Sequence, residues 1–112
     1  MAVRKVSVGR HLTAGTTETL YTVPDGYRAS WNLLYMINNT ASSKAFTVGW
    51  YDAAGNLQAH VFQSYPISSK TYVMFDSGAW INMDSGHYVT ITTEAGADAD
   101  AILSFELERN NT

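Results

Sequence analysis

The stretch Thr16-Thr17-Glu18-Thr19-Leu20-Tyr21-Thr22-Val23-Pro24-Asp25-Gly26-Tyr27-Arg28-Ala29 decides the fold. A Pro-Asp-Gly turn lies between two β-prone runs, and this combination predicts a hairpin-type turn between a strand and its return strand, because Pro fixes φ and Gly accepts a positive φ. The second run continues from Trp31 to Asn38 with apolar residues on both faces. We therefore expect a long strand here that is central in its sheet or lies at a subunit contact.

Side chains of a strand alternate between its two faces, so the long run divides into two sets. One face is expected to carry Trp31, Leu33, Tyr35 and Ile37, and the other Asn32, Leu34, Met36 and Asn38. A second reversal is predicted at Gly55-Asn56, between runs at 46–50 and 57–61. Its return strand is expected to carry Leu57, Ala59 and Val61 with Gln58 and His60 outward.

No stretch sustains a helical period, and turn signals recur about every 8–12 residues. At the end of the chain, Leu103, Phe105 and Leu107 alternate with polar residues that we expect to face water. This pattern predicts an all-β, single-domain antiparallel β-sandwich over residues 1–112, jelly-roll-like, with about eight strands. Residues 1–13 are expected to form an N-terminal arm that becomes ordered on a partner, and residues 109–112 a polar tail.

The composition excludes several kinds of partner and site. Only 15% of the 112 residues are charged, well below the usual fraction, which indicates that a partner covers part of the surface. The net charge is −3 and the seven basic residues are scattered, so nucleic-acid binding is not expected. With no cysteine the chain has neither a disulfide nor a thiolate metal site. The N-terminal residues lack the apolar segment of a secretion signal, and no run is long enough for a membrane span.

One segment resembles a catalytic motif. Val73-Met74-Phe75-Asp76-Ser77-Gly78-Ala79 is similar to the signature of retroviral-type aspartic proteases, which work as dimers because two carboxylates share one proton. The sequence after Gly78 is too short for the flap that follows the motif in those enzymes, and the apolar-apolar-Gly element expected beneath their site is absent. We therefore interpret Asp76 as the start of a turn.

The remaining polar residues do not form a recognised site. His11, His60 and His87 lack the spacing of zinc ligands, and Ser85 lacks the nucleophile elbow that would make it a partner for His87. Asp98 and Asp100 offer oxygens for calcium, but a solvated loop is the preferred interpretation because no EF-hand pattern surrounds them. We expect neither an enzyme nor a bound cofactor.

Aromatic residues make up 12% of the chain, which leaves two interpretations open. Trp31, Trp50, Trp80 and the seven tyrosines are suited to stacking on sugars, as in carbohydrate-binding modules. Tyr and Trp are also enriched in protein interfaces, and in a β domain with so few charges we favour core and interface roles.

Residues 19–29 resemble the opening of small virion proteins of tailed bacteriophages, which share a Thr-x-Leu-Tyr-Thr-Val-Pro-x-Gly-x-x-Ala pattern. The resemblance continues through the loop at 38–43, the run Phe46-Thr47-Val48-Gly49-Trp50-Tyr51-Asp52, and the run Ser85-Gly86-His87-Tyr88-Val89-Thr90-Ile91. It departs from the group at His87, where an Asp is usual. In order, it spans about residues 16–108.

The resemblance implies a non-enzymatic structural protein of the virion, made in the bacterial host cytoplasm. The preferred expectation is a capsid decoration (cement) protein that binds the outside of the mature head as a homotrimer and braces contacts between copies of the major capsid protein. The alternatives are a tail or fibre module that binds host glycan, and a component of the head–tail junction. The expected interface residues are Tyr21, Tyr27, Trp50, Tyr51 and Phe62.

Overall fold

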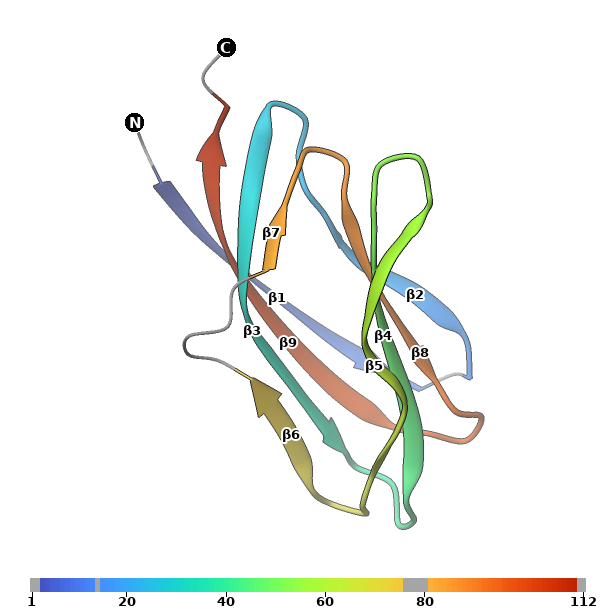
Figure 1. Cartoon of the computed structure of the whole chain (residues 1–112). Coiled ribbons are helices and arrows are strands. Elements are labelled where there is room, and N and C mark those ends of the chain that lie inside the picture. The colour runs from blue at the N-terminus through green and yellow to red at the C-terminus, as the bar shows by residue number, and fades with distance from the viewer. Residues whose placement is uncertain (1–2, 14, 76–80, 111–112) are drawn as a thin grey trace.

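The computed structural model describes residues 3–13, 15–75 and 81–110, and these fold as two packed antiparallel sheets (Figure 1). The first sheet has the order β1-β9-β3-β6, with β7 also paired to β3, and consists of β1 Val3–Leu12, β9 Ala99–Arg109, β3 Tyr27–Asn38, β6 Tyr72–Phe75 and β7 Ile81–Met83. The second has the order β2-β8-β4-β5 and consists of β2 Thr17–Thr22, β8 Tyr88–Thr93, β4 Lys44–Tyr51 and β5 Leu57–Ile67. The expected jelly-roll-like β-sandwich is confirmed, with nine strands in the described part of the chain.

The turn that decides the fold joins β2 of one sheet to β3 of the other. The Tyr27 N–H donates to the carbonyl of Pro24 at 3.2 Å, and Gly26 has a φ of 84°. A positive φ costs an L-residue energy that glycine avoids, which explains the glycine at this corner. The turn is therefore formed as the Pro-Asp-Gly sequence predicts, but the expected hairpin is wrong: β2 pairs with β8 and β3 pairs with β9, so the turn joins strands of different sheets.

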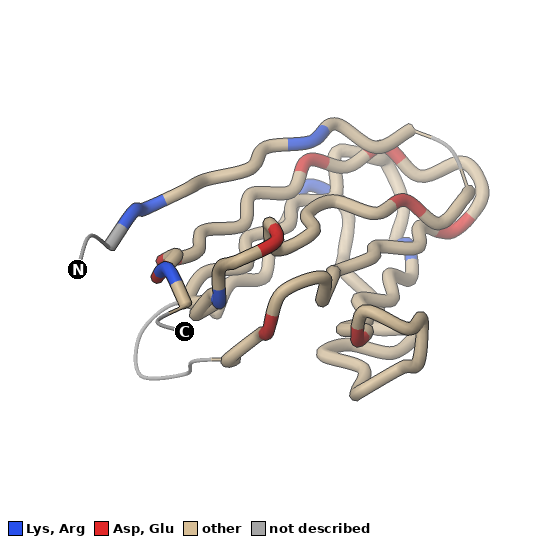
Figure 2. The backbone as a smooth tube through the Cα atoms, turned by 90° about the horizontal axis from the view of Figure 1, so that it is seen from above, with Lys and Arg blue, Asp and Glu red and all other residues tan. Residues whose placement is uncertain are grey.

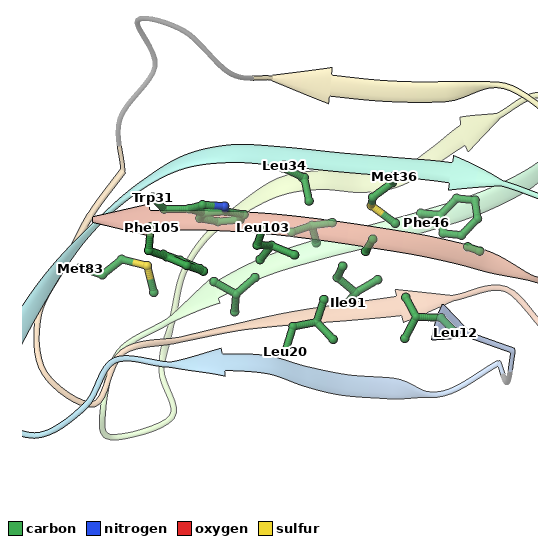
Figure 3. Packing of buried hydrophobic residues seen from close by; sticks show 14 of the residues in the cluster. Leu12, Leu20, Trp31, Leu34, Met36, Phe46, Met83, Ile91, Leu103 and Phe105 are labelled. Carbon is green, nitrogen blue, oxygen red and sulfur yellow. The ribbon is translucent and has the colours of Figure 1, made fainter. Parts of the chain in front are cut away.

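The core lies between the two sheets and is built from alternate residues of their strands (Figure 3). At its centre the Trp31 ring stacks at 6.0 Å from the Phe105 ring, and both side chains are almost completely buried. Leu34, Met36 and Leu103 pack beside them, facing Phe46 and Ile91 of the other sheet. Because the described chain has no helix, these two inner faces form its buried core.

The long strand β3 is central, as expected, but its two faces exchange roles halfway along. Trp31 is paired with Phe105 and Leu33 with Ser104, so Asn32 is an extra residue on the β3 side. Such a bulge shifts the alternation by one residue. The predicted grouping holds from Leu33 to Asn38 but is wrong at the bulge, because Trp31 lies on the buried face with Leu34, Met36 and Asn38 instead of with Leu33.

The segment expected as an N-terminal arm lies in the first sheet. Residues 3–12 form β1, which pairs with β9 from Val3 opposite Glu108 to Leu12 opposite Ala99. The reason is that its inward positions are apolar: Leu12 is almost completely buried, and Val6 and Val8 pack against the core. The expected tail begins inside β9, because Arg109 is paired with Tyr27.

The predicted hairpin around residues 52–56 is confirmed by the pairing of β4 with β5. Its return strand differs from the expectation, since Leu57 and Ala59 are exposed. The register between the two strands shifts at three places, and β5 is at the edge of its sheet, so regular alternation does not hold there. Pro66 lies in this edge strand, where the lack of an N–H is tolerated.

Candidate assembly surfaces

Two of the five expected interface residues, Tyr21 and Tyr27, belong to the end of the sandwich where β1 begins and β9 ends. Both are half-buried. The Tyr21 ring stacks on Phe105 with ring centroids 4.4 Å apart, and burial raises the pKa of Tyr21. Tyr21 is thus largely used in packing, while Tyr27 has cationic neighbours that are described below.

The other three expected residues, all half-buried, come from β4 and β5. The Trp50 indole N–H donates to His87 Nδ1 at 3.1 Å. Tyr51 stacks on Tyr88 with centroids 5.1 Å apart, and Phe62 stacks on Tyr65 at the same distance. Each of these rings therefore already has an aromatic or imidazole neighbour within the protein.

The most exposed large apolar side chains lie elsewhere. Of the five described residues in this class, three are on the outer face of the first sheet: Tyr72, Met74 and Ile102. Tyr35 is paired with Met74 on one side and Ile102 on the other, and its ring stacks on Tyr72 with centroids 5.3 Å apart. We call Tyr35, Tyr72, Met74 and Ile102 the outer row.

Sequence reasoning missed the outer row because the bulge in β3 reverses which residues point outward. One signal was present: Tyr72-Val73-Met74-Phe75 and Ala101-Ile102-Leu103 are apolar at consecutive positions, so each must expose or cover a second apolar face. That signal gives no face or register by itself, since both follow from the pairing with β3.

At one end of the β1–β9 pair, the exposed imidazole of His11 lies beside two carboxylates. Its Nδ1–H donates to Asp100 at 2.6 Å, and its Nε2 lies 3.6 Å from Asp98. The Asn39 amide donates to Asp100 at 3.0 Å and to Asp98 at 3.3 Å. The hydrogen bond to Asp100 raises the pKa of His11, and the hydrogen bonds from His11 and Asn39 lower the pKa of Asp100. We call these four residues the histidine–aspartate end.

At the other end of the same pair, two arginines flank Tyr27. The guanidinium carbon of Arg4 lies 6.0 Å from the centre of the Tyr27 ring, and that of Arg109 lies 5.7 Å from it. These distances are within the range of cation–π interactions. Arg4 also lowers the pKa of Tyr21, opposing the larger effect of burial. We call Arg4, Tyr27 and Arg109 the arginine–tyrosine cluster.

The described residues do not form the catalytic or metal sites that the sequence analysis weighed. Over 3–13, 15–75 and 81–110 there is no group of three or more His, Cys, Asp or Glu side chains arranged to hold a metal ion. Ser85 Oγ donates to the Tyr27 carbonyl, and His87 accepts from Trp50. Asp76-Ser77-Gly78 and Trp80 lie outside the described residues. No helix in the described part of the chain is long and apolar enough to cross a membrane.

Comparison with known proteins relates the chain to others by fold. No family model matches the sequence, and no curated protein matches it. A chain of the acid-stable capsid of Helicobacter pylori bacteriophage KHP30 superposes with a TM-score of 0.61 at 10% identity, covering 99% of this chain and 100% of that one. A chain from Bacillus endospore appendages, described as disulfide-linked pili, gives 0.59 at 16% identity, covering 97% and 89%.

A third match has a TM-score at the lower limit of a shared fold. A chain of the cyanophage Pam1 capsid asymmetric unit superposes with a TM-score of 0.50 at 14% identity, covering 96% of this chain and 85% of that one. With identities this low the three comparisons establish the fold alone. That fold is a jelly-roll-like sandwich found in phage capsid and pilus structures.

Proposed function

We propose that this protein is a non-enzymatic structural protein of a tailed-phage virion, and within it a capsid decoration protein. The observation that carries the proposal is the full-length superposition on a chain of a phage capsid, which leaves almost no part of either chain unmatched. The phage-like motifs between residues 19 and 91 support the same assignment independently of the fold. In this role the protein binds the outside of the mature head as a homotrimer and braces neighbouring copies of the major capsid protein.

The surface of the molecule fits a protein that is partly covered in an assembly. Few of its residues are charged, and the outer row exposes apolar side chains on one sheet face. Many small subunits that bind only the mature shell stabilise it by mass action, because each one adds its binding free energy to that state alone. The half-buried aromatic residues Tyr21, Tyr27, Trp50, Tyr51 and Phe62 stay the proposed contacts with the capsid or a neighbouring subunit.

Immunogold electron microscopy of purified particles tests this proposal, with an antibody raised against the protein. Label spread over the head is expected. Label confined to the tail or its tip contradicts the decoration role and favours the fibre module. Heads grown without the protein are expected to lose DNA at a lower temperature than complete heads, and mass photometry of the purified protein is expected to show a trimer.

The superposition on the appendage chain favours one second candidate, a subunit of an extracellular filament. That relative is described as disulfide-linked, and this chain has no cysteine, so the same covalent linkage is chemically excluded here. A filament of this protein therefore needs non-covalent contacts. Filaments that form from the purified protein alone, with no label on particles, would favour this candidate over the decoration protein.

A further inference from the structure

The four arginines of the chain fall into two pairs that differ in their partners. Arg10 contacts Glu18 at 2.7 Å and Arg28 contacts Glu108 at 2.6 Å, so each has its charge balanced within the protein. Arg4 and Arg109 are exposed, and neither has a carboxylate partner among the described residues. Their shared neighbour is the face of Tyr27.

The arginine–tyrosine cluster is assembled by three strands. Arg4 is paired with Leu107 across β1 and β9, and Tyr27 is paired with Arg109 across β3 and β9. Paired residues share a face, and Leu107 is buried, so all three cluster residues project from the core-facing side of the first sheet. They lie where that side reaches the end of the sandwich. Figure 2 shows Lys and Arg positions gathered near the two marked chain ends.

Neighbouring turns fix the backbone of this cluster. The Asn110 N–H, next to Arg109, donates to the Gly26 carbonyl at 2.8 Å. The Asn110 amide donates to Ser85 Oγ at 3.3 Å, and Ser85 in turn donates to the Tyr27 carbonyl. These bonds join the end of β9 to the two turns beside it. The two guanidinium groups therefore stand near one ring on a backbone that is already ordered.

A site of this kind suits a carboxylate. A guanidinium presents its N–H groups in a planar fork that matches the two oxygens of a carboxylate, and stacking on an aromatic ring leaves those edges free. Two like charges held beside one ring also repel each other, and an anion between them removes that repulsion. We infer that the arginine–tyrosine cluster is a docking site for Asp or Glu side chains of a protein partner.

The surroundings favour a protein carboxylate over a polyanion. Asp25 and Asp84 lie in the turns that flank the cluster. These carboxylates repel a nucleic acid, which needs an extended basic surface. One or two acidic side chains bring far less negative charge toward these acids than a phosphate backbone does. Tyr and Arg are also the residues that most often dominate protein interfaces.

This inference rests on the proposed virion location only for the source of the partner, and it is tested first without particles. The probe is a short peptide with three acidic residues, each Glu or Asp. The comparison peptide has Gln in place of each Glu and Asn in place of each Asp. Nuclear magnetic resonance of the arginine Nε–H groups reports each arginine separately. The acidic peptide is expected to shift Arg4 and Arg109 and to leave Arg10 in place, and the amide peptide is expected to shift none.

The second arm measures binding of the purified protein to heads grown without it. The double variant Arg4→Gln/Arg109→Gln is expected to bind about tenfold more weakly or worse, because it removes two hydrogen-bonded charge contacts. The control Arg10→Gln removes one positive charge from β1, the strand that also carries Arg4, and its binding is expected to stay within about twofold of wild type. Thermal melting of each variant checks that it is folded.

The outcomes separate the two proposals. If the acidic peptide shifts neither Arg4 nor Arg109, the docking site is wrong whatever the heads do. If a DNA oligonucleotide or sialyllactose shifts them more strongly than the peptide, the partner class is wrong. If the wild-type protein does not bind heads while the peptide shifts both arginines, the decoration role fails and the carboxylate site stands. Where the wild-type protein does bind heads, equal binding by the double variant and by Arg10→Gln also overturns the site.

Discussion

The two ends of the β1–β9 pair use charge in opposite ways. At one end His11, Asn39, Asp98 and Asp100 are joined by hydrogen bonds of 2.6, 3.0 and 3.3 Å, which pair their opposite charges. At the other, about 24 Å along β1, Arg4 and Arg109 have an aromatic ring and no carboxylate among the described residues. The same two strands therefore end once in a closed network and once in an open cationic site.

The two ends therefore differ in role: the polar groups of the histidine–aspartate end bind one another, and the arginines of the arginine–tyrosine cluster are available to a binding partner. A network whose opposite charges are already paired contributes to the stability of the free protein, by a small amount where the side chains are exposed. An arginine without a carboxylate contributes little to folding, and its hydrogen-bonding capacity is available for binding. Substitutions at the first end should change stability, and substitutions at the second should change binding.

The largest loss of stability is expected from a substitution in the core, which positions both ends of the β1–β9 pair. Phe105→Ala removes the ring that stacks on Tyr21 and Trp31, and its side chain is 1% exposed. Deleting such a buried ring costs about 3–5 kcal/mol through lost transfer free energy and the cavity left behind. Urea unfolding followed by tryptophan fluorescence measures the loss.

The matched control for that substitution is an apolar residue that points outward from the same strand. Ile102 is 42% exposed, so Ile102→Ala should lower the free energy of unfolding by less than about 1 kcal/mol. Equal losses for the two variants would contradict the assignment of inner and outer faces, and with it the position of both ends.

The next largest loss of stability is expected beside the histidine–aspartate end, at the last residue of β3. Asn38 is completely buried, and its amide donates to the carbonyls of Ser42 at 3.0 Å and Ile67 at 2.8 Å. Its Oδ1 accepts from the Thr40 N–H at 2.8 Å. Asn38→Ala leaves these groups without their partner and should cost about 2–3 kcal/mol.

Chemical denaturation again supplies the measurement, with Asn82→Ala as the control. Asn82 is exposed and accepts one bond from Ser30 at 3.2 Å, so its loss should cost less than about 0.5 kcal/mol. An Asn38 variant as stable as the Asn82 variant would show that the buried amide does not hold this end together.

A smaller loss of stability is expected at the turn beside the arginine–tyrosine cluster. Gly26 has a φ of 84°, and a Cβ added there meets nothing within 4 Å, so Gly26→Ala tests backbone strain alone. The expected loss is about 1–2 kcal/mol. Gly9→Ala is the counterpart in β1, where a Cβ also meets nothing and φ is not positive; its stability should stay the same or rise by about 0.5 kcal/mol. Thermal melting compares the two variants. A larger loss of stability for Gly9→Ala than for Gly26→Ala would refute the turn geometry.

Much of the fold follows from the sequence because alternation and turn chemistry are local. In β9 the inward positions Leu103, Phe105 and Leu107 and the outward residue Ser104 lie as the pattern predicts. The face change in β3 could not be predicted in this way. The bulge at Asn32 is set by the register with β9, and no Gly or Pro marks it in the sequence.

The candidate surfaces were predictable only in part. Residue type alone selected Tyr21 and Tyr27, and their role in an interface stays a prediction. Arg4 and Arg109 lie near opposite ends of the sequence, and they come together because β1 and β3 both pair with β9. Non-local pairing of this kind depends on the whole topology, so no short motif could reveal the cluster.

The smallest effect on stability is expected from pH, acting on the histidine–aspartate end. The pKa of His11 is raised above 6.5, so its contribution to stability is complete below pH 6.5 and is lost as the pH rises through the folded-state value. The pKa of Asp100 is lowered below 3.8, so its contribution is present above pH 3.8 and is lost as the pH falls through its folded-state value. The contact between His11 and Asp100 is therefore strongest between pH 3.8 and pH 6.5.

The difference in melting temperature between wild type and His11→Gln should be largest near pH 5 and should shrink toward pH 9. His60→Gln is the control, because the contact of His11 with Asp98 and Asp100 is intact in that variant. A difference for His11→Gln that is the same at pH 5 and pH 9 would mean that the imidazole acts through packing, and that the closed end is held by Asn39 alone.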